Sequence, residues 1–163
     1  MGKKTIRRQP RQPNASNKQT ALRIWAPFFF WSAVIFALSA YPRALIPQSK
    51  YFSWDKLAHL VEYGILGYVS ARAFYFSGIR RLYSHYFRFT LVFGALFGVS
   101  DELHQYFVKG RYASVYDVIA DVIGVLFGAY LFARLLKRRA AQPSEVVESI
   151  AHKKFIHKLD AGE

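Results

Sequence analysis

The sequence lacks cysteine and is poor in acidic residues. No cysteine occurs among its 163 residues, which excludes disulfide bonds and thiolate metal sites. Asp and Glu together number 10 against 23 Lys and Arg, a formal net charge of +13. The chain also has no glycine-rich nucleotide loop, no H-E-x-x-H motif and no nucleophile elbow. These absences exclude a P-loop ATPase and a zincin-type peptidase.

Apolar residues are abundant, and they are concentrated in blocks. Hydrophobic residues make up 53% of the chain and aromatic residues 18%, which is high for a soluble domain. Nucleic-acid binding would require the basic residues on one face of a folded core. Here they flank the apolar blocks, an arrangement that suits anionic lipid head groups and the control of membrane topology. We therefore expect membrane lipids as partners and no nucleic acid.

Four blocks approach the length that a membrane-spanning helix requires. A bilayer core about 30 Å thick needs about 20 apolar residues in a helix. A cleaved signal peptide is the alternative for the first block, but its apolar part is long and no A-x-A site follows. We predict an all-α membrane protein, a bundle of four transmembrane helices at residues 22–40, about 57–76, about 87–107 and 115–136.

The ends of the chain are basic and polar. Residues 1–20 hold six Lys or Arg, two prolines and no acid, which predicts a disordered tail. Residues 137–163 predict a second basic tail, with a loosely periodic stretch that could form a short surface helix. The membrane domain then covers residues 21–136.

The positions of Lys and Arg predict the orientation in the membrane. Both tails and the loop between the second and third spans are rich in these residues, and basic loops stay on the cytoplasmic side. The other two loops carry only Arg43 and Lys50, and Lys109 and Arg111. Both termini are therefore expected in the cytoplasm, and the two poorer loops on the outer side.

Most polar residues of the last three spans fall near the same, outer membrane face. With a rise of about 1.5 Å per residue, Glu62, Asp101 and Asp121 lie roughly 8 to 9 Å below that face. Helical spacings of i, i+4 and i+7 place the polar residues of the second span on one side. The set comprises Asp55, His59 and Glu62 in the second span, Asp101, Glu102 and Gln105 in the third, and Asp117 and Asp121 in the fourth.

Burial in lipid would be costly for these groups. An ionisable side chain that faces lipid at this depth costs about 2.5 to 3.5 kcal/mol on insertion scales. We therefore predict a polar pocket that opens outward between the second, third and fourth helices. Small residues would let these helices approach closely. They are Gly64 and Gly67, Gly94 and Gly98, and Gly124 and Gly128.

The loop before the fourth span adds a turn and a cation. Gly110 permits a tight turn, and Ser114 is a candidate N-cap for the fourth helix. Arg111 would lie above the acids, where its planar guanidinium could pair with them or hold a phosphate or carboxylate. Lys56 is interpreted as an interfacial anchor whose charged end reaches the head groups.

At these residues the chain resembles the VanZ-like family of small bacterial membrane proteins, over roughly residues 54–128. Two positions depart from the family pattern: Asp121 stands where Asn is usual, and Lys109 where Pro is common. The resemblance implies a bacterial cytoplasmic membrane protein linked to teicoplanin resistance and cell-envelope homeostasis, with no defined reaction. The matching residues are Asp55, Lys56, His59, Tyr63, Leu66, Gly67, Asp101, Glu102, Gln105, Gly110, Arg111, Ser114, Asp117, Gly124 and Gly128.

One hypothesis is an enzyme that acts on a lipid-linked or cell-wall substrate. Glu62 or Asp101 would be the general base and His59 the proton shuttle. A divalent cation, magnesium or calcium, would suit an oxygen-rich site, although the sequence names no metal ligand. The candidate catalytic residues are Asp55, His59, Glu62, Asp101, Glu102, Gln105 and Asp117, and the candidate substrate-binding residues are Arg111, Tyr63 and Asp121.

Two other classes remain open, and so does the question of whether the protein is an enzyme. The same acids could bind a cation or cationic ligand in a carrier, which with four short helices would need to be a dimer. Alternatively, the polar residues could lock the helices together in a non-catalytic assembly factor of the cell envelope. The sequence fixes no oligomeric state.

Overall fold

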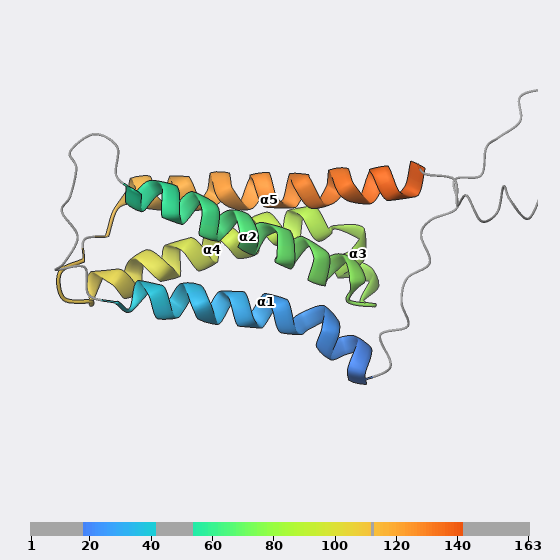
Figure 1. Ribbon diagram of the computed structural model, residues 1–163, viewed down its shortest axis with the longest axis horizontal. Helices are drawn as coiled ribbons and strands as arrows, with labels where there is room; N and C mark the ends of the chain where they lie inside the picture. The colour runs from blue at the N-terminus through green and yellow to red at the C-terminus, as the bar shows by residue number, and fades with distance from the viewer. Residues whose placement is uncertain (1–17, 42–53, 112, 142–163) are drawn as a thin grey trace, which may run out of the picture. The chain divides into compact units, whose positions relative to one another are not determined.

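The computed structural model describes residues 18–41, 54–111 and 113–141. Within these ranges every regular element is a helix, which confirms the predicted all-α class. Residues 12–133 form one compact unit, and the part of α5 from Arg134 onward belongs to a second unit. The helices are α1 (Lys18–Ser39), α2 (Trp54–Phe76), α3 (Arg80–Ser84), α4 (Tyr86–Tyr106) and α5 (Val115–Ala141) (Figure 1).

The four predicted spans coincide with α1, α2, α4 and α5 to within a few residues at most of their ends. By length and composition, α1 and α5 could each cross a membrane. In α2 and α4 the apolar runs are interrupted by the charged residues that the sequence analysis singled out. The predicted tails, including the surface helix, lie largely outside the described residues.

Glycines bring the backbones of α2 and α5 into direct contact. A Cβ atom added to Gly124 would lie 2.5 Å from the carbonyl oxygen of Leu60. At Gly128 an added Cβ would overlap the carbonyl oxygen of Gly64, and at Gly67 that of Val125. No side chain fits at these three positions, so their predicted role in close helix packing is confirmed.

Apolar side chains pack around this contact in two clusters. One joins α1 to α2 through Ile24, Phe28, Ala73 and Phe74. The other joins α1, α2 and α5 through Ile35, Tyr63, Leu66 and Val125. Within the first unit α2 is therefore central, since it packs against α1, α4 and α5 (Figure 1).

Two glycines with positive φ form the turns. Gly110 has φ 83° and follows α4, as predicted, because only glycine adopts this conformation without strain. Gly78, with φ 75°, follows α2, and the backbone N–H of Ile79 donates to Ser77 Oγ at 3.2 Å. The next residues form the short helix α3 where the sequence analysis expected only a loop. Residues 80–84 contain neither glycine nor proline, so nothing stops the helical turn.

Candidate functional site

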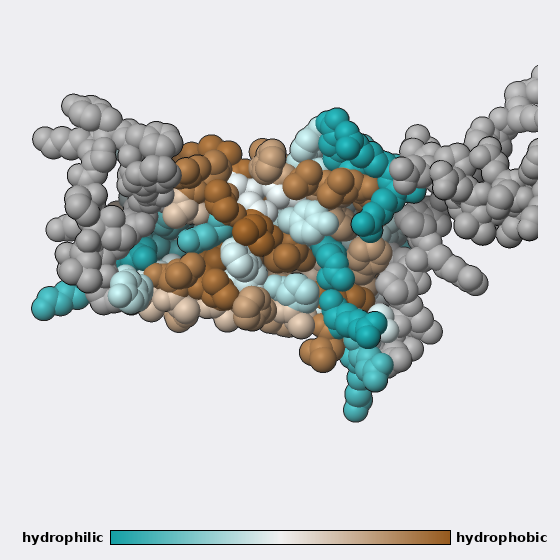
Figure 2. Space-filling model, in the orientation of Figure 1, coloured by the Kyte–Doolittle hydropathy of each residue, from teal (hydrophilic) through white to brown (hydrophobic). Residues whose placement is uncertain are grey.

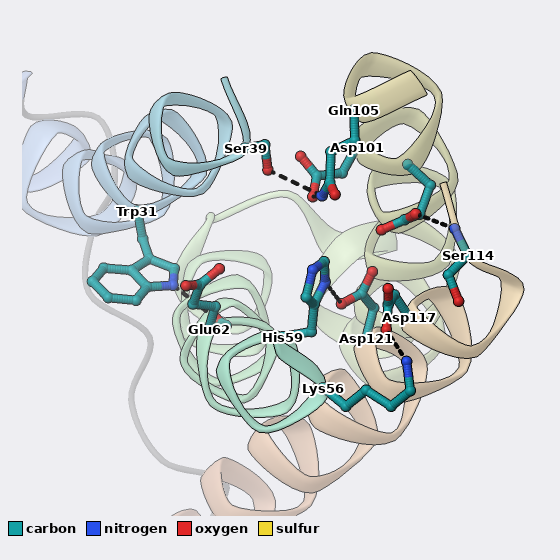
Figure 3. A network of polar contacts seen from close by, with 11 residues as sticks. Trp31, Ser39, Lys56, His59, Glu62, Asp101, Gln105, Ser114, Asp117 and Asp121 are labelled. Carbon is teal, nitrogen blue, oxygen red and sulfur yellow. Dashed lines mark hydrogen bonds and ion pairs between the residues drawn. The ribbon is translucent and has the colours of Figure 1, made fainter. Parts of the chain in front are cut away.

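Six polar side chains that the sequence analysis selected are buried near one end of α2, α4 and α5. They form the polar cluster of His59, Asp101, Glu102, Gln105, Asp117 and Asp121. Figure 3 shows labelled members from the three helices facing a common region. The polar cluster thus brings together side chains from three helices that are far apart in the sequence.

The centre of the polar cluster is a pair between α2 and α5. His59 Nδ1 lies 2.9 Å from Asp121 Oδ1, and the Asp121 side chain is completely buried. Its other oxygen, Oδ2, has no hydrogen-bond partner. A Cβ atom on Gly98 of α4 would lie 3.0 Å from Oδ2. Gly98 therefore provides the space that this carboxylate occupies between the helices.

Glu102 connects α4 to the beginning of α5. Its Oε2 accepts a hydrogen bond of 2.8 Å from the backbone N–H of Ser114. The Ser114 carbonyl in turn accepts from the N–H groups of Asp117 and Val118, so Ser114 occupies the predicted N-cap position. A carboxylate is favourable here because the first N–H groups of a helix lack partners within it. Glu102 Oε1 is buried and unpartnered.

Lys56, which the sequence analysis interpreted as an interfacial anchor, pairs with an acid. Its Nζ lies 2.7 Å from Asp117 Oδ1, with 47% of the Lys56 side chain exposed and 4% of that of Asp117. Asp117 is also in the first turn of α5, where the helix dipole favours a negative charge. The sequence signal for this contact was the spacing of Lys56 and His59, which places both on one side of α2.

Helix α1 also reaches the polar cluster, which the sequence analysis did not anticipate. Gln105 Nε2 donates to Asp101 Oδ2 at 2.9 Å and lies 3.5 Å from Ser39 Oγ. Trp31 Nε1 donates to the backbone carbonyl of Glu62 at 2.8 Å. In Figure 3 Glu62 lies on the α1 side of α2, whereas His59 points toward Asp121. Glu62 and His59, though close in sequence, therefore face different neighbours.

Arg111 makes contacts that give it a structural role. Its Nη2 donates to the carbonyl of Leu38 at 2.8 Å and its Nε to that of Tyr41 at 3.2 Å. Leu38 is in the last turn of α1 and Tyr41 follows the end of the helix, a place where a cation interacts favourably with the last carbonyls. The predicted anion-binding role of Arg111 stays a prediction.

The remaining candidates differ in their surroundings. Tyr63 is fully buried in the second apolar cluster, its ring stacked 6.3 Å from that of His59, and its hydroxyl group is unpartnered. The side chain of Asp55 lies outside the described residues.

Replacing Arg111 by alanine tests its structural role. Two hydrogen bonds from a charged donor would be lost, so we expect Arg111→Ala to destabilise the purified protein by about 1 to 2 kcal/mol. Thermal unfolding in detergent measures this, with the exposed Lys109→Ala as control. An unchanged melting temperature would argue against the capping role.

Three members of the polar cluster are close enough to act on one small group. Ligand-type atoms of His59, Glu102 and Asp121 all lie within 4.8 Å of one another. An imidazole beside carboxylates can transfer protons or bind a cation.

A family model described as VanZ/LLP1 matches residues 3–137. The chain belongs to the VanZ/LLP1 family. The match includes all five helices except the last residues of α5, so it extends beyond the segment on which the sequence resemblance was based. Searches of curated proteins and of solved structures found no significant match. VanZ/LLP1 membership and the two long apolar helices together indicate a membrane protein.

Proposed function

We propose that all four long helices span a bacterial cytoplasmic membrane. His59 of α2 and the acids Asp101 and Glu102 of α4 are buried inside the bundle, and the outer faces of both helices are apolar. Exposed apolar side chains recur at helical spacing, which is the inverse of the pattern expected in water. They are Leu57, Val61 and Ile65 on α2, and Val92, Leu96, Val99 and Leu103 on α4. Figure 2 shows hydrophobic residues along the helices of one face, with hydrophilic ones toward the ends.

The orientation is supported by charge. Arg80 and Arg81 of α3 and Arg88 of α4 lie at the ends of α2 and α4 that are remote from the polar cluster. The positive-inside rule assigns that end to the cytoplasm. Both termini would then be cytoplasmic, and the polar cluster would lie near the outer leaflet.

Single-cysteine labelling tests this topology, since the chain has no cysteine of its own. We expect Ala113→Cys, an exposed position beside the polar cluster, to react with a membrane-impermeant maleimide added outside spheroplasts. Ser84→Cys in α3 should react only after the membrane is permeabilised. Labelling of both positions from the same side would refute the four-span arrangement.

The polar cluster is proposed to act on a lipid-linked or cell-wall substrate at the outer leaflet. This activity would link the protein to envelope homeostasis and teicoplanin resistance. The observation that carries the proposal is that Glu102 Oε1 and Asp121 Oδ2 are buried without partners beside an ionisable His59. In a purely structural network we would expect each of these oxygens to accept a hydrogen bond, because each buried polar group without one lowers the stability of the fold by about 1 to 3 kcal/mol.

The geometry suggests how protons would be moved. Asp121 Oδ1 holds the His59 ring in a fixed orientation, as a carboxylate does for a catalytic base. His59 could then accept a proton from a substrate group and return it to the leaving group. Access would come from the side of the exposed Lys56 and Ala113, the residues at which the cluster borders the surface.

A non-catalytic assembly factor is the second candidate. It is favoured by the contacts that are satisfied within the protein: Lys56 with Asp117, Gln105 with Asp101, and Ser114 with Glu102. The first and third contacts join different helices or a helix to the start of the next, and the second lies within α4. The polar cluster could therefore serve to hold one shape for a partner protein.

Glu102→Gln separates the two candidates. An amide oxygen can still accept from Ser114, so we expect the variant to fold, while the lost carboxylate should abolish substrate chemistry. Cells that depend on this copy should then become teicoplanin-sensitive at an unchanged membrane level of the protein. Glu148→Gln, in the C-terminal segment, is the matched control. Full resistance in Glu102→Gln cells, with unaltered lipid-linked precursor pools, would contradict the catalytic proposal and favour the assembly factor.

A further inference from the structure

We propose that His59, Glu102 and Asp121 bind one divalent transition-metal ion, of the zinc or manganese class. This inference concerns the same site as the proposed function and specifies the cofactor that the site would use. Each ligand comes from a different helix: His59 from α2, Glu102 from α4 and Asp121 from α5. A bound ion would therefore join the three helices at the polar cluster.

The distances between the three side chains suit a metal ion. Their candidate ligand atoms lie within 4.8 Å of one another. Ligands about 2.0 to 2.2 Å from a zinc ion stand about 3.4 Å apart at tetrahedral positions. Rotations of the Glu102 and Asp121 side chains by small amounts would close the difference.

The unpartnered oxygens supply the second, independent observation. Glu102 is 5% exposed and Asp121 is 0% exposed, and each has one oxygen without a hydrogen-bond partner. Asp121 Oδ2 faces Gly98 of α4, and Glu102 is one helical turn further along the same side of α4. The unpartnered oxygens thus belong to two acids, one on α5 and one on α4, whose ligand-type atoms lie within 4.8 Å of each other.

The charge balance also favours a cation. Glu102 and Asp121 are two buried carboxylates, and a protonated His59 would compensate only one of their negative charges, which leaves a buried charge that is unfavourable without a partner. The nearby cation, Lys56, pairs with Asp117 and is half exposed. A divalent ion among the three ligands would neutralise the charge where it lies.

The donor set favours a transition metal over magnesium or calcium. The sequence alone suggested the latter because its acids dominate, but one nitrogen of His59 takes part in the group. Imidazole nitrogen suits zinc or iron, and the two carboxylates also suit manganese, whereas magnesium and calcium prefer oxygen ligands alone. Three protein ligands would leave a coordination position for water or substrate, as in catalytic rather than structural sites.

Metal analysis of the full-length protein tests the inference. The protein is purified in detergent, reconstituted in lipid nanodiscs, stripped with a chelator and titrated with Zn²⁺ or Mn²⁺. We expect about one tightly bound ion per chain, as for a site of three protein ligands, and a Co²⁺ derivative with the visible absorption bands of a nitrogen- and oxygen-ligated ion. Glu102→Gln and Asp121→Asn should each weaken binding at least about tenfold.

The control is Glu148→Gln, which changes an acid that is not a member of the polar cluster; this variant should retain the ion. If Asp121→Asn fails to fold, the affinity of Glu102→Gln for the ion decides whether the metal site exists. If no ion binds, or if wild type and both ligand variants bind it equally, the metal site is wrong. The resistance experiment, which tests the proposed function, is unaffected by that result. Binding that depends on the ligands in a protein with no envelope phenotype keeps the site and overturns the proposed function.

Discussion

Gly128→Ala is expected to separate α5 from α2 and to leave little folded protein in the membrane. An alanine Cβ would overlap the carbonyl oxygen of Gly64 and lie 2.7 Å from the backbone N of Tyr68. Both are backbone atoms in the middle of a helix, so no change of rotamer relieves the clash. Overpacking costs 1 to 3 kcal/mol where side chains can yield, and we expect about 3 kcal/mol or more here.

The facing helix provides a matched control. A Cβ on Gly64 would meet only the carbonyl oxygen of Gly124, at 3.7 Å, which is an ordinary contact distance. Gly64→Ala should therefore be tolerated, although the same helices meet there. Gly67→Ala, which would overlap the Val125 carbonyl, should resemble Gly128→Ala. Chemical denaturation in detergent measures all three, and similar stabilities for Gly64→Ala and Gly128→Ala would contradict the described α2–α5 contact.

His59→Leu is expected to cost about 3 to 5 kcal/mol in metal-free protein, and a second substitution should recover most of it. The single variant removes the partner of Asp121 Oδ1, and Oδ2 has none. A completely buried carboxylate would then have no hydrogen bond at all. In His59→Leu/Asp121→Leu the carboxylate is gone and two apolar side chains of similar size can pack.

A double-mutant cycle with Asp121→Leu measures the coupling between these residues. Unfolding is followed in chelator-treated protein so that bound metal does not contribute. The matched control is Ser70→Ala, because Ser70 is a buried polar residue of α2 outside the polar cluster. If the double variant is no more stable than His59→Leu, the two side chains do not form the buried pair described above.

Several features of this protein could be predicted from the sequence because they depend on local chemistry. Long apolar blocks bounded by basic residues fixed four of the helices, since a helix satisfies its own backbone. Gly110 was predictable as a turn because few other residues adopt its φ of 83°. The selection of the acids for the polar cluster followed from their scarcity and from the cost of exposing them to lipid.

The partners of these residues were less predictable. The sequence suggested that Arg111 lies over the acids, and the structure gives it the carbonyls at the end of α1. It grouped Glu62 with His59, yet the two face different helices (Figure 3). Ser39 and Trp31 belong to the first predicted span, in which no sequence pattern indicated a contact with the polar residues of the other helices. Spacing shows which side chains share one face of a helix but not which neighbour that face meets.

The sequence by itself determined that this VanZ/LLP1 protein consists of apolar helices with a few inward-facing charges, because composition and periodicity act within each segment. Only the tertiary structure decided that His59, Glu102 and Asp121 converge. That convergence depends on how α2, α4 and α5 are rotated and how closely they approach. Backbone contacts at Gly67, Gly124 and Gly128 set these for α2 and α5, and Gly94 and Gly98 give α4 its place beside Val125 and Asp121. The α2–α5 contacts form only when residues about 60 positions apart in the chain come together.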